Sequence, residues 1–121
     1  GGPFWVQIKV NEPVKFAVTS ATTVAEKSKL TVNCANPLTL KFTTTMKINA
    51  KGDVIFYYKR SDTVTTAPAT ITLAGPETET KKYSWNIDAP ITAGDYWVAM
   101  YIEEPNHQLF NKAKVTITCA P

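Results

Sequence analysis

The sequence predicts an all-β protein, built as an antiparallel sandwich of two sheets with about seven or eight strands. Thr, Val and Ile make up 36 of the 121 residues, and their branched side chains pack well on pleated sheets. Apolar and polar residues alternate along most of the chain, which is the period of a half-buried strand. Turn residues interrupt this alternation about every 8 to 12 residues, a spacing typical of sandwiches and barrels. No segment has the helical period that a parallel sheet with crossover helices requires.

The first alternating run covers residues 4–10 and ends at the sequence Asn-Glu-Pro. Its apolar residues are Phe4, Trp5, Val6, Ile8 and Val10. On a strand, Val6, Ile8 and Val10 share one face. A second run begins at Val14 and ends near Thr22. We therefore divide the chain into an N-terminal extension, residues 1–12, and a sandwich domain, residues 13–121.

The longest alternating run extends from Leu38 to Ile48 and predicts a half-buried strand. Its inward positions are Leu38, Leu40, Phe42, Thr44, Met46 and Ile48. A turn at residues 51–53 leads to a second strand over residues 54–59, which is apolar and aromatic on both faces. Two strands joined by a short turn that contains glycine predict a β-hairpin.

The rest of the chain contains one short apolar segment and four further predicted strands. Leu30 and Val32 form the short apolar pair that precedes Cys34. The four strands cover residues 70–73, 77–87, 96–102 and 109–119. Between them lie a polar loop at residues 60–68 and turns rich in glycine, proline, asparagine and aspartate.

Residues 93–98, with the sequence AGDYWV, resemble the turn into the sixth strand of immunoglobulin-like and fibronectin-III-like sandwiches. The segments VIFYYKRSD, AGDYWVAMYI and NKAKVTITC extend this resemblance to Ig-like modules of bacterial secreted and surface proteins, over about two thirds of the chain. The resemblance implies an Ig-like sandwich with one extra N-terminal strand, and it implies that Tyr96 caps a corner with its hydroxyl. The chain departs from antibody-type domains at Val98, where those domains place a cysteine.

Cys34 and Cys119 are the only cysteines, and neither has a histidine or cysteine neighbour at the spacing of zinc ligands. Two isolated cysteines in a small β-rich chain favour one disulfide and an extracellular or cell-surface location. The alternative is a pair of buried thiols in a reduced protein. A disulfide between them would hold the last strand in place and stabilise the domain by about 4 kcal/mol.

The ionisable residues do not form the pattern of a catalytic site. His107 is the only histidine and lies in a turn, and Glu103 and Glu104 point to opposite faces of a strand. Asp88 and Asp95 flank one connection and are the only weak candidates for calcium ligands, with hydrogen bonding to their own turns as the alternative. We therefore expect no enzymatic activity, no cofactor and no bound metal.

Charge and hydropathy limit the partners. The net charge is +3, and the basic residues are spread among threonines, whereas a nucleic-acid site needs a denser basic groove with aromatics on the same face. No apolar run reaches the roughly 18 residues of a membrane helix. We expect neither nucleic acid nor a membrane span. Trp5, Tyr57 and Trp97 are the aromatic residues best suited to stack on a sugar ring.

These observations predict a non-enzymatic, extracellular structural or interaction module, whose partners are other protein domains or copies of itself. The strand at residues 4–10 either folds back on its own domain or pairs with an open sheet edge of a neighbouring copy. Repetition of the second arrangement would build a surface fibre or a pilus-like filament. A carbohydrate-binding or adhesion module that uses exposed aromatics is the alternative.

Overall fold

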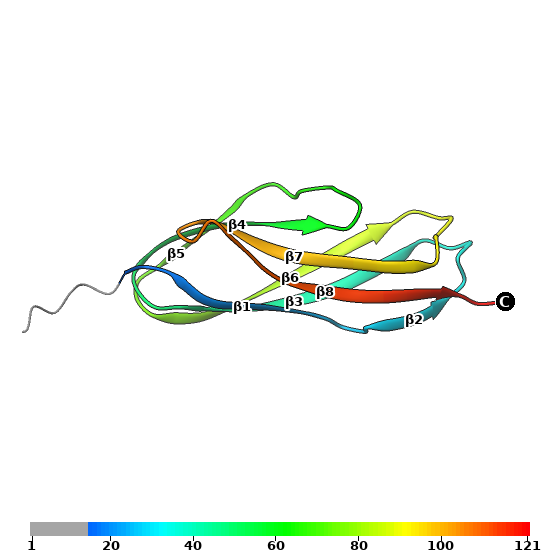
Figure 1. Ribbon diagram of the computed structural model, residues 1–121, viewed down its shortest axis with the longest axis horizontal. Helices are drawn as coiled ribbons and strands as arrows, with labels where there is room; N and C mark the ends of the chain where they lie inside the picture. The colour runs from blue at the N-terminus through cyan, green and yellow to red at the C-terminus, as the bar shows by residue number, and fades with distance from the viewer. Residues whose placement is uncertain (1–14) are drawn as a thin grey trace, which may run out of the picture.

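The computed structural model describes residues 15–121, which form two β-sheets packed face to face (Figure 1). The three-stranded sheet contains, in spatial order, β1 (Val18–Ala25), β3 (Leu38–Ile48) and β6 (Glu77–Ile87). The five-stranded sheet contains, in spatial order, β2 (Lys29–Val32), β8 (Gln108–Cys119), β7 (Gly94–Glu104), β4 (Gly52–Arg60) and β5 (Ala69–Leu73). The prediction of an all-β, two-sheet sandwich is confirmed. The predicted strand at residues 4–10 and its boundary with the sandwich lie outside the described residues.

Alternation along the strands builds the core. On β3, the side chains of Leu40, Phe42, Thr44 and Met46 are at most 2% exposed, while Lys41, Thr43 and Thr45 between them face outward. The five-stranded sheet supplies the opposite wall of the core, with Val54, Val98, Ile102 and Val115 fully buried. Each such side chain contributes about 1.5–3 kcal/mol when it is removed from water.

The predicted hairpin between residues 38–48 and 54–59 is wrong. β3 pairs with β1 and β6, and β4 pairs with β5 and β7, so the chain crosses from one sheet to the other between them. Alternation shows which side chains face the core, but two strands that cover the core from opposite sides have the same pattern. Asn49 holds this crossing, because its side chain accepts a hydrogen bond from Ala17 N–H (2.8 Å) and donates one to the Lys15 carbonyl (2.9 Å).

β1 belongs to one sheet and its continuation, β2, belongs to the other. β1 pairs with β3 from Val18 opposite Ile48 to Ala25 opposite Phe42. The chain then crosses over, and β2 runs parallel to the end of β8. Among the described strands, this pair is the single exception to the predicted antiparallel arrangement.

A β-bulge explains why the second alternating run was placed incorrectly. The register of β1 against β3 shifts between Val18 and Ser20. After this shift Ala21 and Thr23 face the core, so the strand continues to Ala25 and does not end near Thr22. An inserted residue of this kind changes the phase of alternation locally, which the sequence pattern alone does not show.

Two asparagine side chains bond to the main chain of β1: Asn106, in the turn between β7 and β8, and Asn111, on β8. Asn106 accepts a hydrogen bond from Val18 N–H (2.9 Å) and donates one to the Val18 carbonyl (2.8 Å). Asn111 makes the same pair of bonds with Thr23, both at 2.9 Å. A carboxamide carries one acceptor and two donors, so it can replace the main chain of a neighbouring strand. These asparagine bridges close the side of the sandwich where β1 and β8 meet.

Cys34 and Cys119 form a disulfide with a Cα–Cα distance of 5.4 Å, which confirms the predicted bond. It ties the residues after β2 to the end of β8, at the pole where the C-terminus leaves the sandwich (Figure 1). Ile91 N–H donates to the Cys34 carbonyl at 2.8 Å, and Ala120 N–H donates to the Val32 carbonyl at 2.7 Å. Because the cysteines are 85 residues apart, the bond restricts the unfolded chain strongly, by about 4 kcal/mol.

Gly52, at the start of β4, lies directly against the ring of Phe16. A Cβ at Gly52 would lie 2.6 Å from Phe16 Cε2, whereas a Cβ at Gly75 would meet no atom within 4 Å. We predict that Gly52→Ala lowers the free energy of unfolding by about 1–3 kcal/mol, the usual cost of overpacking. Gly75→Ala, the matched control, should change it by less than about 0.5 kcal/mol. Urea denaturation measures both, and equal effects would contradict the prediction.

Candidate functional site

Two of the predicted ligand-stacking aromatics lie together on the outer face of the five-stranded sheet. Tyr57 alternates with the buried residues of β4 and therefore points outward, and Trp97 points outward from β7. Tyr57 lies directly opposite Tyr101 of β7, and their rings stack with centroids 5.0 Å apart at an angle of 20°. Sequence reasoning missed Tyr101, although its position four residues after Trp97 on a strand places both on one face. The third predicted aromatic, Trp5, lies outside the described residues.

Lysine side chains lie over these rings. Lys59 Nζ is 4.9 Å from the centroid of Tyr101, and Lys112 Nζ is 4.4 Å from the centroid of Trp97. Both are cation–π contacts. Because the rings of Tyr57 and Tyr101 face each other, they do not form one flat platform. We call Tyr57, Lys59, Trp97, Tyr101 and Lys112 the aromatic patch.

Loss of hydration raises the pKa of Tyr57, and the nearby Tyr101 and Glu103 raise it further. The Tyr57 hydroxyl offers a hydrogen-bond donor on this face. Together with the ammonium groups of Lys59 and Lys112, it makes the aromatic patch a surface of donors around apolar rings. Such a surface can bind a ligand rich in oxygen atoms.

Tyr96, near the start of β7, has a structural position. Its hydroxyl donates a hydrogen bond to the carbonyl of Thr92, four residues earlier, at 2.5 Å. Its ring packs edge-on against the buried Trp85, with centroids 5.6 Å apart. This arrangement is the corner hydrogen bond that the family resemblance implies for Tyr96.

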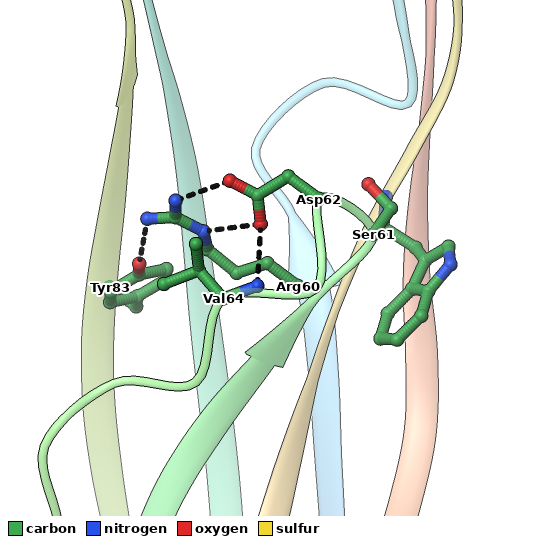
Figure 2. A network of polar contacts seen from close by, with 6 residues as sticks. Arg60, Ser61, Asp62, Val64 and Tyr83 are labelled. Carbon is green, nitrogen blue, oxygen red and sulfur yellow. Dashed lines mark hydrogen bonds and ion pairs between the residues drawn. The ribbon is translucent and has the colours of Figure 1, made fainter.

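Arg60, the last residue of β4, links the loop after it to β6 (Figure 2). Its guanidinium donates to both carboxylate oxygens of Asp62, at 3.0 and 2.5 Å, and to the Tyr83 hydroxyl at 3.1 Å. The guanidinium also lies 4.7 Å from the centre of the Trp85 ring. Asp62 in turn accepts a hydrogen bond from Val64 N–H at 3.2 Å. All of these groups are engaged with one another, so the cluster fixes the loop.

A chain of hydroxyl groups crosses the core between the two sheets. The Thr44 hydroxyl lies 2.7 Å from that of Thr23 and 3.0 Å from that of Tyr58. The ring of Tyr58 stacks on Tyr83 with centroids 4.6 Å apart. Burial raises the pKa of Tyr58. In the described residues, no buried side-chain nitrogen or oxygen lacks a hydrogen-bond partner, so these polar groups stabilise the core.

The carboxylates considered as calcium ligands are not brought together with other ligands. Asp95 accepts a hydrogen bond from Thr116 at 2.8 Å and pairs with Lys114 at 3.2 Å, and these partners lower its pKa. Within residues 15–121, no group of three His, Cys, Asp or Glu residues is arranged to hold a metal ion. His107 lies 3.5 Å from Glu104 at an exposed turn. None of the described residues forms a helix long and apolar enough to span a membrane.

A hollow of about 270 Å³ lies where β1 leaves the three-stranded sheet. Leu30, Leu38, Leu40 and Val115 form its apolar wall, and Glu26 lies among its charged residues. We call this the crossover hollow. A second, more open hollow of about 640 Å³ lies beside it, around Val24 and Thr43. Neither was predicted, because the sequence pattern shows neither where β1 leaves its sheet nor which strands lie side by side.

No protein-family model matches the chain, and no curated protein matches its sequence. Among solved structures, the chain is similar to the CARDB domain of a Pyrococcus furiosus protein, crystallised in complex with di-metal ions. The TM-score is 0.59 at 13% identity, covering 85% of this chain and 96% of that domain. A solution structure of the same domain gives a TM-score of 0.55 at 14% identity, covering 81% of this chain and 94% of that one.

Two β-glucosidases also contain a similar sandwich. The enzyme from Erythrobacter marinus has a TM-score of 0.57 at 9% identity, and the match covers 86% of this chain but 15% of the enzyme. The Listeria innocua enzyme, in complex with isofagomine, has a TM-score of 0.57 at 14% identity, and the match covers 86% of this chain but 16% of the enzyme. Identities this low show the fold alone. The chain is an immunoglobulin-like β-sandwich domain, as predicted.

The ion pair between Arg60 and Asp62 should make stability depend on pH. Hydrogen bonds from Arg60 lower the pKa of Asp62 in the folded state. The stabilisation is therefore complete above the unfolded pKa of about 3.9 and is lost as the pH falls through the lower folded pKa. We predict that Asp62→Asn costs about 1 kcal/mol at neutral pH, since the pair is partly exposed.

Urea denaturation of the wild type and of Asp62→Asn, repeated from about pH 7 down to about pH 2, measures this difference. Asp53 is exposed and lies on β4, the strand that ends at Arg60, and Asp53→Asn is the control. The two variants should differ at neutral pH and converge in acid. A loss that is independent of pH would show that the charge of Asp62 does not contribute.

Proposed function

We propose that this chain is a non-enzymatic structural module of a secreted or surface-attached protein, and that copies of it join through the N-terminal strand at residues 4–10. The observation that carries the proposal is the placement of the chain ends. The described chain enters at one pole of the elongated sandwich, at Lys15, and leaves at the opposite pole, at Pro121 (Figure 1). A module with its ends at opposite poles adds length along one axis, as a spacer or a fibre subunit does.

The disulfide supports an extracellular or cell-surface location, because such bonds persist in oxidising compartments and are rare in the cytosol. The likeness to a CARDB domain supports a small β-sandwich module. The β-glucosidases match over only about a sixth of their length, so their likeness brings no catalytic domain to this chain. The polar clusters described above are engaged in holding the fold, which supports a role without catalysis.

Deletion of residues 1–12 tests the assembly function. We expect the full chain to form larger particles as its concentration rises, and the shortened chain to remain a monomer with the same unfolding midpoint. Static light scattering measures particle size. As matched variants, Ile8→Ser with Val10→Ser should abolish assembly, whereas Gln7→Ser with Lys9→Ser, on the other face, should not. An unchanged particle size after the deletion would show that the extension has no such role.

A carbohydrate-binding or adhesion function is the second candidate. The observation that favours it is that Tyr57, Trp97 and Tyr101 lie on one outer face, beside the donors of the aromatic patch. Rings that stack on a sugar face and donors that bind its hydroxyls are the groups such a site needs. Trp97 is the largest of these rings.

Sedimentation with insoluble cellulose, chitin and xylan tests this candidate. We predict that Trp97→Ala weakens any binding by about three- to ten-fold, as expected for the loss of one aromatic contact. Val24→Ala removes an exposed apolar side chain from the opposite sheet and is the matched control. The absence of binding by the wild type, or an equal loss in both variants, would reject this function.

A further inference from the structure

We propose that the crossover hollow, together with the adjacent edge of β3, is the acceptor for residues 4–10 of a second copy of this chain. The inference rests on the proposed assembly function and names the surface that assembly uses. The strand of one copy would pair in antiparallel direction with Leu38–Lys41 of the next copy. Its apolar face would lie against the apolar wall of the hollow.

The main chain at the start of β3 is open on one side. β1 accompanies β3 only as far as Ala25, opposite Phe42, and Glu26 N–H then donates to the Lys41 carbonyl at 2.8 Å. Beyond that bond, no main-chain group of residues 15–121 pairs with this side of residues 38–40. An open edge of this kind accepts an added strand.

The crossover hollow has the size and character for side chains of an added strand. Leu30, Leu38, Leu40 and Val115 give it an apolar wall, and Leu30 and Leu38 are only half-buried. Its volume of about 270 Å³ lies below the roughly 300–1,000 Å³ of most small-molecule sites. Alternate residues of a strand point to one side, so residues 4–10 present Val6, Ile8 and Val10 together. These branched side chains are apolar, as are the side chains that form the wall of the hollow.

Other long edges of the described sandwich are protected. On β6, Glu79 and Lys81 lie on the side of the strand that faces the core, and inward-pointing charges of this kind prevent edge pairing. The edge of β1 is bridged to β8 by Asn106 and Asn111. β5 has only five residues. The start of β3 combines an open main chain with an apolar wall.

The length of the extension requires a second copy. Val18 lies opposite Ile48, and Leu40 lies eight residues from Ile48 on β3, which is about 26 Å at about 3.3 Å per residue. Lys15 precedes Val18 and is held by Asn49 at the far end of β3. Ile8 lies seven residues before Lys15, which extend at most about 25 Å, so it cannot reach the hollow of its own domain.

The same geometry makes the contact a head-to-tail one. The described chain begins at one pole, whereas β2 and the start of β3, which line the crossover hollow, lie toward the pole of the C-terminus (Figure 1). When two copies stack end to end, the extension of one therefore runs along β3 of the next in the direction of β1, which is antiparallel to β3. The contact joins two different surfaces and repeats without closing, so it produces a filament.

Photo-crosslinking in the full chain tests the acceptor. A benzoylphenylalanine in place of Ile8, in a mixture of ¹⁵N-labelled and unlabelled copies, should crosslink between copies to the segment at residues 30–41. The same group in place of Lys9, on the other face of the strand, is the control and should give about ten-fold less of this product. Leu38→Lys should lower the assembled fraction by a similar factor, whereas Thr45→Lys, exposed on the outer face of the same strand and outside the hollow, should leave it unchanged.

The outcomes separate the two proposals. If the full chain does not assemble, the proposed function fails. If it assembles but Ile8 crosslinks to β5, to β6 or within its own copy, the acceptor proposed here is wrong and the function stands. Circular dichroism checks the fold of Leu38→Lys, and if that variant does not fold, the crosslinked peptides decide the question.

Discussion

The structure depends on one constraint: the segment formed by β1 and β2 is shared between the two sheets. β1 completes the three-stranded sheet and β2 extends the five-stranded sheet, so the segment covers one side of the core. β1 pairs with β3 on one edge only. On its other edge, the side chains of Asn106 and Asn111 make the hydrogen bonds that a neighbouring strand would make. The shared segment also brings β2 beside β8, where the disulfide forms, and it leaves the start of β3 open.

The polar residues inside the sandwich specify how the two sheets face each other. Hydrogen bonds among Thr23, Thr44 and Tyr58 connect three strands across the core. A buried polar group without a partner costs about 1–3 kcal/mol, so sliding one sheet against the other would be penalised more strongly here than in a purely apolar core. Nearer the surface, the contacts of Arg60 with Tyr83 and Trp85 join β4 of one sheet to β6 of the other.

The sequence predicted the elements better than their arrangement. Alternation located β3 and β6 at their observed bounds, because each strand buries one face. It did not show that β3 and β4 lie in different sheets, since inward-facing residues look the same from either side of the core. The disulfide was predictable because only two cysteines are present. The bridges of Asn106 and Asn111 were not, because an asparagine that binds a distant strand has the same sequence signature as one in a turn. For the aromatic patch, Tyr57 and Trp97 followed from alternation, and so would Tyr101, whereas the stacking of Tyr101 on Tyr57 required the register between β4 and β7.

The disulfide has a mechanical consequence for a module that is pulled at its two ends. Tension applied at Lys15 and Pro121 passes along β1 and β2 to Cys34 and then directly through the sulfur atoms to Cys119. Residues 35–118 lie outside this covalent path, so they cannot be drawn out as extended chain while the bond is intact. Only the twenty residues from Lys15 to Cys34, and the last two of the chain, can be drawn out. Those twenty residues extend to about 70 Å at most, so a stretched array of such modules would lengthen in short, limited steps, while the disulfide retains residues 35–118 as a closed loop.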